Sequence, residues 1–302
     1  MKVTSLPDIP AVPPGEAPRR RVAIGTFDGV HVGHREVIRG NDTVLTFDPH
    51  PIAVISPDAR PKLLMPHSIK QDLIAGLGVH ELVVIPFDRD FADRSAEDFV
   101  EGVLIGQLGA DSVSVGENFR FGKGARGTAE FLSSYHEFET RVVPLVGVAG
   151  ETVSSSQIRG LVAAGEVDKA AQFLGGPYLL EGEVVHGDKR GRELGMPTAN
   201  IVPDPLLVAP GHGVYAGWAH GYPAAINIGV RPTFETGRGL LIEPYLIGFQ
   251  GDLYGETIRI AFVERMRGEQ RFESVGELVE QMKRDVEQAK EICAATKRSP
   301  GD

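Results

Sequence analysis

Apolar and polar positions alternate in two different ways along the chain, and the change falls near residue 175. In the first part, short apolar runs predict strands at 21–27, 44–47, 81–87, 111–115 and 140–146. Segments with helical spacing lie between them, at 69–77, 96–108 and 128–135. Because alternating strands and helices build a parallel sheet with helices on its faces, this part predicts an α/β domain.

The second part has a different period. Helical spacing continues over 161–174 and is interrupted by a Gly-Gly-Pro sequence at 175–177. Short β-type runs then follow between Gly- and Pro-rich turns, at 179–185, 213–218, 224–228, 240–249 and 257–262. Such a pattern favours an antiparallel sheet or a small barrel. Apolar positions at helical spacing over 275–289 predict one long helix at the end.

These patterns divide the chain into three predicted parts. Residues 1–20 are rich in proline and are expected to form a flexible lead-in. Residues 21–176 form the predicted α/β domain, and residues 177–302 form the all-β domain with its terminal helix. A length of 302 residues is enough for two domains with real cores.

Composition narrows the classes of function. The formal net charge is -10, which disfavours a general nucleic-acid binder. No apolar stretch is long enough to span a membrane, and the N-terminus lacks the apolar run of a signal peptide. The single cysteine, Cys293, excludes an internal disulfide and fits a reducing cytoplasm. We therefore expect a cytoplasmic protein with small-molecule substrates and neither a nucleic-acid nor a membrane partner.

The first candidate site is the segment from Gly25 to His34, which follows a strand and opens a helix-like stretch. Gly25 and Gly29 permit tight turns and close approach of a ligand. On a helix, His31 and His34 would share a face, where they could stabilise charge on a triphosphate during adenylyl transfer. Two other interpretations remain: a pair of metal ligands, for which no third ligand stands out nearby, and a purely structural turn.

A second segment, from Ser154 to Arg159, places three serines before a helix and an arginine within it. Serine hydroxyls and an arginine guanidinium can hold phosphate. The structural alternative is an ordinary serine N-cap with a surface arginine.

The third candidate site lies in the second half, from Gly187 to Asn200. Three glycines and several basic residues form a loop able to cradle phosphates, although the P-loop pattern is absent. Thr198 and Asn200 would share one face of a strand, where their neutral oxygens could form part of a magnesium shell. Glu243, in an apolar strand-like run, is the best candidate for the base that phosphorylation of an alcohol calls for. A mobile charged hairpin and an outward-facing strand glutamate are the corresponding structural alternatives.

Two of these segments together resemble a known pattern. The HxGH core within 25–34 and the serine-rich, arginine-bearing 154–159 are similar to nucleotidyltransferases, and 46–51 and 116–122 resemble the bacterial FAD synthetase branch. Three phenylalanines there could be flavin contacts or core residues, at Phe47, Phe119 and Phe121.

The second half resembles riboflavin kinase through its Pro-Thr-Ala-Asn run at 197–200. Further segments fit the same family, at 213–216, 226–234, 253–255 and Arg267. From 21 to about 289 the chain is thus similar to the bifunctional riboflavin kinase/FAD synthetase family, whose order of transferase, kinase and terminal helix it shares.

The resemblance implies a Rossmann-like nucleotidyltransferase domain followed by a small antiparallel β-barrel with a C-terminal helix. It implies phosphorylation of riboflavin to FMN and then adenylylation of FMN to FAD, with ATP and Mg²⁺ in both steps. It further assigns residues to the adenylyltransferase, with ATP at Gly25, Phe27, Asp28, Gly29, His31, His34, Ser155, Ser156 and Arg159, and flavin or nucleotide at Asp48, Asn118 and Arg120. In the kinase it assigns ATP to Gly187, Lys189, Gly191, Thr198 and Asn200, magnesium to Thr198 and Asn200, flavin to Arg267 and the catalytic base to Glu243.

The sequence departs from this family in three places. Only residues 35–43 separate His34 from the next strand, Ser156 stands where threonine is common, and Tyr245 stands where histidine is frequent. Alternatives are a chain in which only the kinase half works, a flavin-binding protein without catalysis, and an adenylyltransferase acting on a pantetheine phosphate. The last would leave 187–200 unexplained.

Overall fold

A computed structural model describes residues 1–11, 18–186, 196–231 and 239–296. The chain separates into two compact units. The first contains Met1–Pro61 and Lys70–Ser154, and the second contains Lys62–Ile69 and Ser155–Asp302. Residues 155–176, predicted as the end of the first domain, thus group with the second unit by their contacts.

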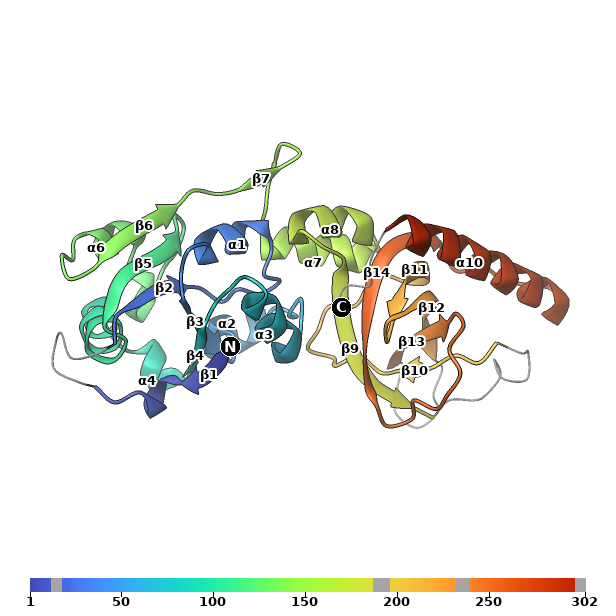
Figure 1. Cartoon of the computed structure of the whole chain (residues 1–302), viewed down its shortest axis with the longest axis horizontal. Coiled ribbons are helices and arrows are strands. Elements are labelled where there is room, and N and C mark those ends of the chain that lie inside the picture. The colour runs from blue at the N-terminus through green and yellow to red at the C-terminus, as the bar shows by residue number, and fades with distance from the viewer. Residues whose placement is uncertain (12–17, 187–195, 232–238, 297–302) are drawn as a thin grey trace. The chain divides into compact units, whose positions relative to one another are not determined.

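The first unit is built on a six-stranded sheet in which all pairs are parallel. Its strands are β1 (Lys2–Ser5), β2 (Arg20–Ile24), β3 (Thr43–Asp48), β4 (Glu81–Pro86), β5 (Ala110–Gly116) and β6 (Glu139–Val143). They lie in the order β1-β4-β3-β2-β5-β6 (Figure 1). This parallel sheet with its helices confirms the predicted α/β class. Parallel strands that are buried on both faces read as continuous apolar runs, which is why the sequence revealed them.

Short helices connect these strands. They are η1 (Leu6–Asp8), α1 (Val32–Ile38), α2 (Pro51–Ile55), η2 (Pro57–Ala59), α3 (His67–Ala75), α4 (Arg89–Ala92), α5 (Ala96–Asp98), η3 (Phe99–Gln107), η4 (Lys123–Ala125) and α6 (Ala129–Ser133). The predicted helix at 96–108 is present as α5 followed by η3, a π-helix whose inner face is buried in the core. A small hairpin of β7 (Gly147–Val148) and β8 (Glu151–Thr152) follows the sheet.

The N-terminal residues correct one expectation. Residues 2–9 belong to the first unit rather than to a flexible lead-in: β1 pairs with β4, and Leu6 and Ile9 are buried in the core. The Gln107 side chain donates a hydrogen bond to the carbonyl of Ile9 over 2.8 Å. Proline content suggested a lead-in because proline disfavours regular structure, but Lys2–Ser5 precedes the first proline of the chain and is free to join a sheet edge.

The second unit is a closed antiparallel barrel of six strands in the order β10-β13-β12-β11-β14-β9 (Figure 1). The strands are β9 (Tyr178–Val185), β10 (Asn200–Ile201), β11 (Gly213–Ala219), β12 (Tyr222–Arg231), β13 (Gly239–Leu246) and β14 (Thr257–Arg267). The predicted small barrel is confirmed, and closure leaves no unpaired sheet edge.

Three helices complete this unit. The predicted helical stretch 161–174 is divided into α7 (Ser155–Ala164) and α8 (Val167–Leu174), because Gly165 has a φ of 82° and ends the first helix. The predicted terminal helix is α10 (Val275–Ala295), which packs on β11, β12 and β14. Trp218, the only tryptophan of the chain, is half-buried on β11. None of the described helices combines the length and the apolar character needed to cross a bilayer.

Candidate active sites

The order of strands in the first unit creates one favoured place for a ligand. From β2 the chain builds the sheet outward through β3 and β4, and it then returns to add β5 on the other side of β2. Ligands of open parallel sheets bind at such a reversal, beyond the carboxyl ends of the strands. The segment from Gly25 to His34 follows β2 at that place, and Asp48 and Asn118 come at or just after the ends of β3 and β5.

The loop that leaves β2 has an unusual backbone. Phe27, Gly29 and Val30 have φ values of 49°, 95° and 39°. Left-handed geometry is easy for glycine, but it costs roughly 1–3 kcal/mol at each of the other two residues. The Phe27 ring also lies so close to Gly25 that a Cβ there would meet it at 3.0 Å. The glycines in this motif therefore serve the fold of the loop itself.

The two histidines lie together at the start of α1. His31 is the N-cap, and its Nδ1 accepts a hydrogen bond of 3.2 Å from the backbone N–H of His34. The two rings stack with centroids 3.5 Å apart, and the His34 ring also contacts Phe27 edge-on. A Cβ on Gly33 would meet the His31 ring at 3.2 Å, so Gly33 makes room for this ring.

Burial determines the charge of His31, which is only 6% exposed. Desolvation lowers the pKa of His31 from 6.5 to about 4, although a backbone hydrogen bond opposes the change. His31 is therefore neutral at neutral pH. Because Nδ1 accepts a hydrogen bond, the ring proton is placed on Nε2, and His31 can offer a neutral N–H donor rather than a positive charge.

The other adenylyltransferase candidates are placed as follows. Asp28 is buried, whereas Asp48, Asn118 and Arg120 are exposed. Phe121 lies in the core of the first unit, and Phe47 and Phe119 pack partly buried against it. The remaining candidates lie on α7, which belongs to the second unit: Ser155, Ser156 and Arg159.

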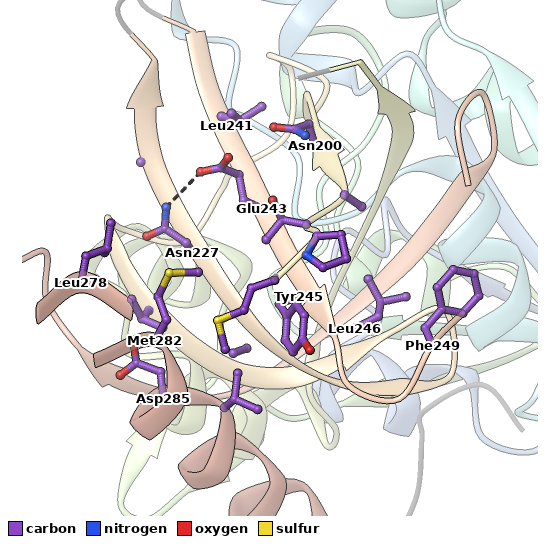
Figure 2. A pocket seen from close by; sticks show the side chains of 18 of the residues that line it. Asn200, Asn227, Leu241, Glu243, Tyr245, Leu246, Phe249, Leu278, Met282 and Asp285 are labelled. Carbon is purple, nitrogen blue, oxygen red and sulfur yellow. Dashed lines mark hydrogen bonds between the residues drawn. The ribbon is translucent and has the colours of Figure 1, made fainter. Parts of the chain in front are cut away.

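The barrel of the second unit contains a cavity of about 1120 Å³. Strand residues line one side, and Leu278, Met282 and Asp285 of α10 line another (Figure 2). Every described residue that the sequence assigned to the kinase lines this cavity: Thr198, Asn200, Glu243 and Arg267. The candidates Gly187, Lys189 and Gly191 lie outside the described residues.

Strand pairing brings Asn200 next to Glu243. Ile201 of β10 pairs with Ile242 of β13, and the N–H of Ala199 donates to the carbonyl of Pro244 over 3.0 Å. In this antiparallel register Asn200 is directly opposite Glu243, and directly opposed residues share a face of the sheet. On the other side of β13, the Asn227 amide donates a hydrogen bond of 3.2 Å to Glu243 Oε2 (Figure 2).

Arg267 is bound within the wall of the cavity. Its Nη2 and Nε donate to the Asp285 carboxylate over 2.7 and 3.0 Å, and Gln281 donates to the same carboxylate over 2.8 Å. Asp285 is only 4% exposed. This forked, partly buried ion pair joins β14 to α10 and fixes the direction of the Arg267 side chain.

The side chains in the cavity could supply part of the ligand shell of a hard cation. Thr198 and Asn200 offer neutral oxygens beside the Glu243 carboxylate. Magnesium favours oxygen ligands and keeps several waters or phosphate oxygens in its shell, so such a partial set fits it. Among the described residues, no cluster of three or more His, Cys, Asp or Glu side chains could hold a metal. No third ligating side chain therefore joins His31 and His34 among the described residues.

Three polar residues near the sites were not found from the sequence. Lys70 of α3 is buried and donates to the carbonyl of Thr26 over 3.0 Å. Asn227 supports Glu243, and Asp285 supports Arg267. A signal exists for two of them: Asn227 interrupts the apolar run of β12, and Asp285 interrupts the apolar stripe of α10. Their partners are distant in sequence, which no local pattern reveals.

The first unit thus has a histidine-bearing loop at the switch point of its sheet, and the barrel has a cavity with a carboxylate in its wall. Comparisons with known proteins identify the family of this chain. The family model for FAD synthetase matches residues 14–157, and the model for riboflavin kinase matches residues 174–293. The chain belongs to the bifunctional riboflavin kinase/FMN adenylyltransferase family.

Individual relatives cover nearly the whole chain. A bifunctional riboflavin kinase/FMN adenylyltransferase of Listeria monocytogenes is 36% identical over 90% of this chain and 92% of its own. The Escherichia coli protein of the same name is 35% identical over 91% of this chain and 93% of its own. A Streptococcus pneumoniae crystal structure described as a macrolide-efflux protein has a TM-score of 0.85 and 30% identity, over 96% of this chain and 99% of that one.

Proposed function

We propose that this chain makes FAD from riboflavin in two ATP-dependent steps. Riboflavin is phosphorylated to FMN, and FMN is then adenylylated to FAD with release of pyrophosphate. The observation that carries the proposal is that one chain holds two sites of different chemistry. One is a cavity with a carboxylate in its wall, and the other is a histidine-bearing loop beyond the ends of parallel strands. The family membership supports the same two reactions.

In the kinase step, assigned to residues 177–302, Glu243 takes the proton of the ribityl hydroxyl. The hydroxyl oxygen bonds to the γ-phosphorus of ATP, the bond from that phosphorus to the β-phosphate bridge breaks, and ADP leaves. The Asn227 amide holds the Glu243 carboxylate in place. Thr198 and Asn200 would hold magnesium, which neutralises developing charge on the phosphates when it is bound. Gly187, Lys189 and Gly191 would bind ATP, and Arg267, held by Asp285, would contact the flavin.

In the adenylyl step, assigned to residues 21–176, the FMN phosphate attacks the α-phosphorus of ATP and pyrophosphate leaves. A phosphate monoester has a second pKa of about 6, so at neutral pH it is already ionised and needs no base. His31 contributes a neutral N–H donor toward the charge that develops on the α-phosphoryl oxygens, and His34 lies stacked on it.

Further residues complete that step. The ATP side is assigned to Gly25, Phe27, Asp28, Gly29, Ser155, Ser156 and Arg159. The flavin or nucleotide side is assigned to Asp48, Asn118 and Arg120. A cytoplasmic location, small-molecule substrates and the lack of a nucleic-acid or membrane partner belong to the same proposal. The single cysteine, Cys293, leaves no partner for an internal disulfide, which fits a reducing compartment.

A chromatographic time course with riboflavin, ATP and magnesium tests the proposal. We expect FMN to appear first and FAD to follow. FMN without FAD would reduce the function to the kinase and direct attention to α1, which is only seven residues long. If neither product forms, FMN supplied directly would distinguish a surviving adenylyltransferase from a protein that only binds flavin.

A further inference from the structure

Lys70 is a buried amine to which the proposed function assigns no role. It is 9% exposed, and its Nζ donates a hydrogen bond of 3.0 Å to the carbonyl of Thr26. Burial lowers the pKa of Lys70, while the negative charges of Asp28 and Asp48 oppose that change. A buried ammonium is costly and persists where specific partners compensate it, so this position calls for an explanation beyond packing.

Two of the groups that act on Lys70 belong to the adenylyltransferase loop, residues 25–31, and the third, Asp48, ends β3. Thr26 lies between Gly25 and Phe27, at the point where the backbone turns into left-handed geometry. Asp28, the next residue but one, is 2% exposed. Lys70 thus holds the first half of the loop through the Thr26 carbonyl, and the carboxylates of Asp28 and Asp48 act on its charge.

A second cation binds the other end of the same loop. Arg35 of α1 donates through Nε to the carbonyl of Val30 over 3.1 Å. Val30 is fully buried and β-branched, and its φ of 39° is strained for such a residue. Two cations from different helices therefore bind the two ends of a strained segment, and His31 follows it directly. A loop with such a backbone keeps its shape only if its surroundings hold it.

We infer that Lys70 is a positioning residue for adenylyl transfer, whose ammonium holds the Thr26 carbonyl and balances Asp28 so that the loop presents His31 to the nucleotide. This inference rests on the proposed function of the first unit. Lys70 acts through the loop and needs no contact with the substrate. Its removal would shift the donor groups from their productive positions, and misplacement by about 1 Å can cost on the order of 100-fold in rate.

The test is Lys70→Met, which keeps much of the length of the side chain and removes its charge and donors. We expect kcat for FMN adenylylation to fall by about 100-fold, with KM for ATP changing by less than about 3-fold. Riboflavin phosphorylation by the same preparation should keep its rate. Lys290→Met, at an exposed lysine of α10, is the matched control and should leave both rates unchanged. An adenylylation kcat within about 3-fold of the parent would overturn the inference.

A second variant separates positioning from folding. Lys70→Ala leaves a space that propylamine can fill as a cation and that 1-propanol can fill only as a neutral molecule. We expect propylamine to raise kcat of the variant by at least about 10-fold and propanol to have no effect. Rescue by both compounds, or by neither in a variant that melts at the parent's temperature, would overturn the inference.

Failure of the proposed function would look different. In that case the parent protein itself would form no FAD from FMN and ATP. If the parent forms FAD and both Lys70 variants form it equally well, only the role of Lys70 is refuted.

Discussion

The two candidate sites differ in structure in a way that matches the two proposed reactions. In the barrel, a carboxylate is held by strand pairing and a side-chain amide within a cavity of about 1120 Å³. In the first unit, the candidate groups lie at or beyond the strand ends and at the start of α1, and His31 is buried and neutral at neutral pH. A hydroxyl nucleophile needs a base, whereas a phosphate nucleophile needs donors for developing charge. Under the proposed assignments, the nucleophile therefore explains which residue types each site contains.

The largest expected effect comes from removing the base. Glu243→Gln keeps the shape of the side chain but cannot take a proton, so riboflavin phosphorylation should fall by about 10²–10⁴-fold. FMN adenylylation measured on the same sample should stay unchanged. Glu183→Gln, at an exposed glutamate of β9, is the control. Equal loss of both reactions in a folded variant would break the division between the two sites.

The second-largest effect is expected from a substitution that impairs adenylylation and spares the kinase step. His31→Ala removes the neutral donor, and loss of one such donor costs about 10²–10³-fold in kcat. FAD formation from FMN should fall by that factor while FMN formation continues, as followed by chromatography of both products. His136→Ala changes an exposed histidine of the same unit and should have no effect. Normal FAD formation by the His31 variant would contradict its assignment.

Burial of His31 should also make the stability of the first unit depend on pH. Its pKa is lowered from 6.5 to about 4, so the unfolded chain binds a proton over this range and the folded chain does not. Stability must therefore fall as the pH decreases from 6.5 toward 4. Between pH 7 and pH 4.5 we expect the parent to lose about 2 kcal/mol more unfolding free energy than His31→Ala, measured by denaturant titration. Parallel pH curves for the two proteins would show that His31 titrates normally.

The smallest effect concerns a glycine. In Gly33→Ala the added Cβ meets the His31 ring at 3.2 Å, so the ring must move by a few tenths of an ångström. We expect about a 10-fold decrease in adenylylation and no change in the kinase step. Gly102→Ala, where a Cβ would meet nothing within 4 Å, is the matched control. If the two alanine variants behave alike, the spacing around His31 is not critical.

Sequence patterns predicted the two-part architecture well because sheet and helix periods are local. Strands β2, β3, β4, β5 and β6 of the first unit and strands β9, β11, β12, β13 and β14 of the barrel fall where apolar runs stand in the sequence. Elements with little local signal were missed: β1, which gains its stability from pairing with β4, and β10, which has only two residues.

The candidate site residues show the same limit. Glu243 and Asn200 were found separately by residue type, and strand pairing then places them opposite each other. The buried supports could not be predicted, because the hydrogen bond from Lys70 to Thr26 spans 44 residues and the one from Asn227 to Glu243 spans 16. Neither the charge state of His31 nor its stacking on His34 can be read from spacing, since both depend on burial.

The position of Trp218 gives the barrel an optical label of its own. Because it is the only indole in the chain and lies on β11, selective excitation of tryptophan observes the second unit alone. Flavins absorb at the wavelengths at which tryptophan emits, so a flavin entering the barrel cavity would quench this emission by energy transfer. Titration with riboflavin would then follow flavin binding in the intact protein, without any dye or added label.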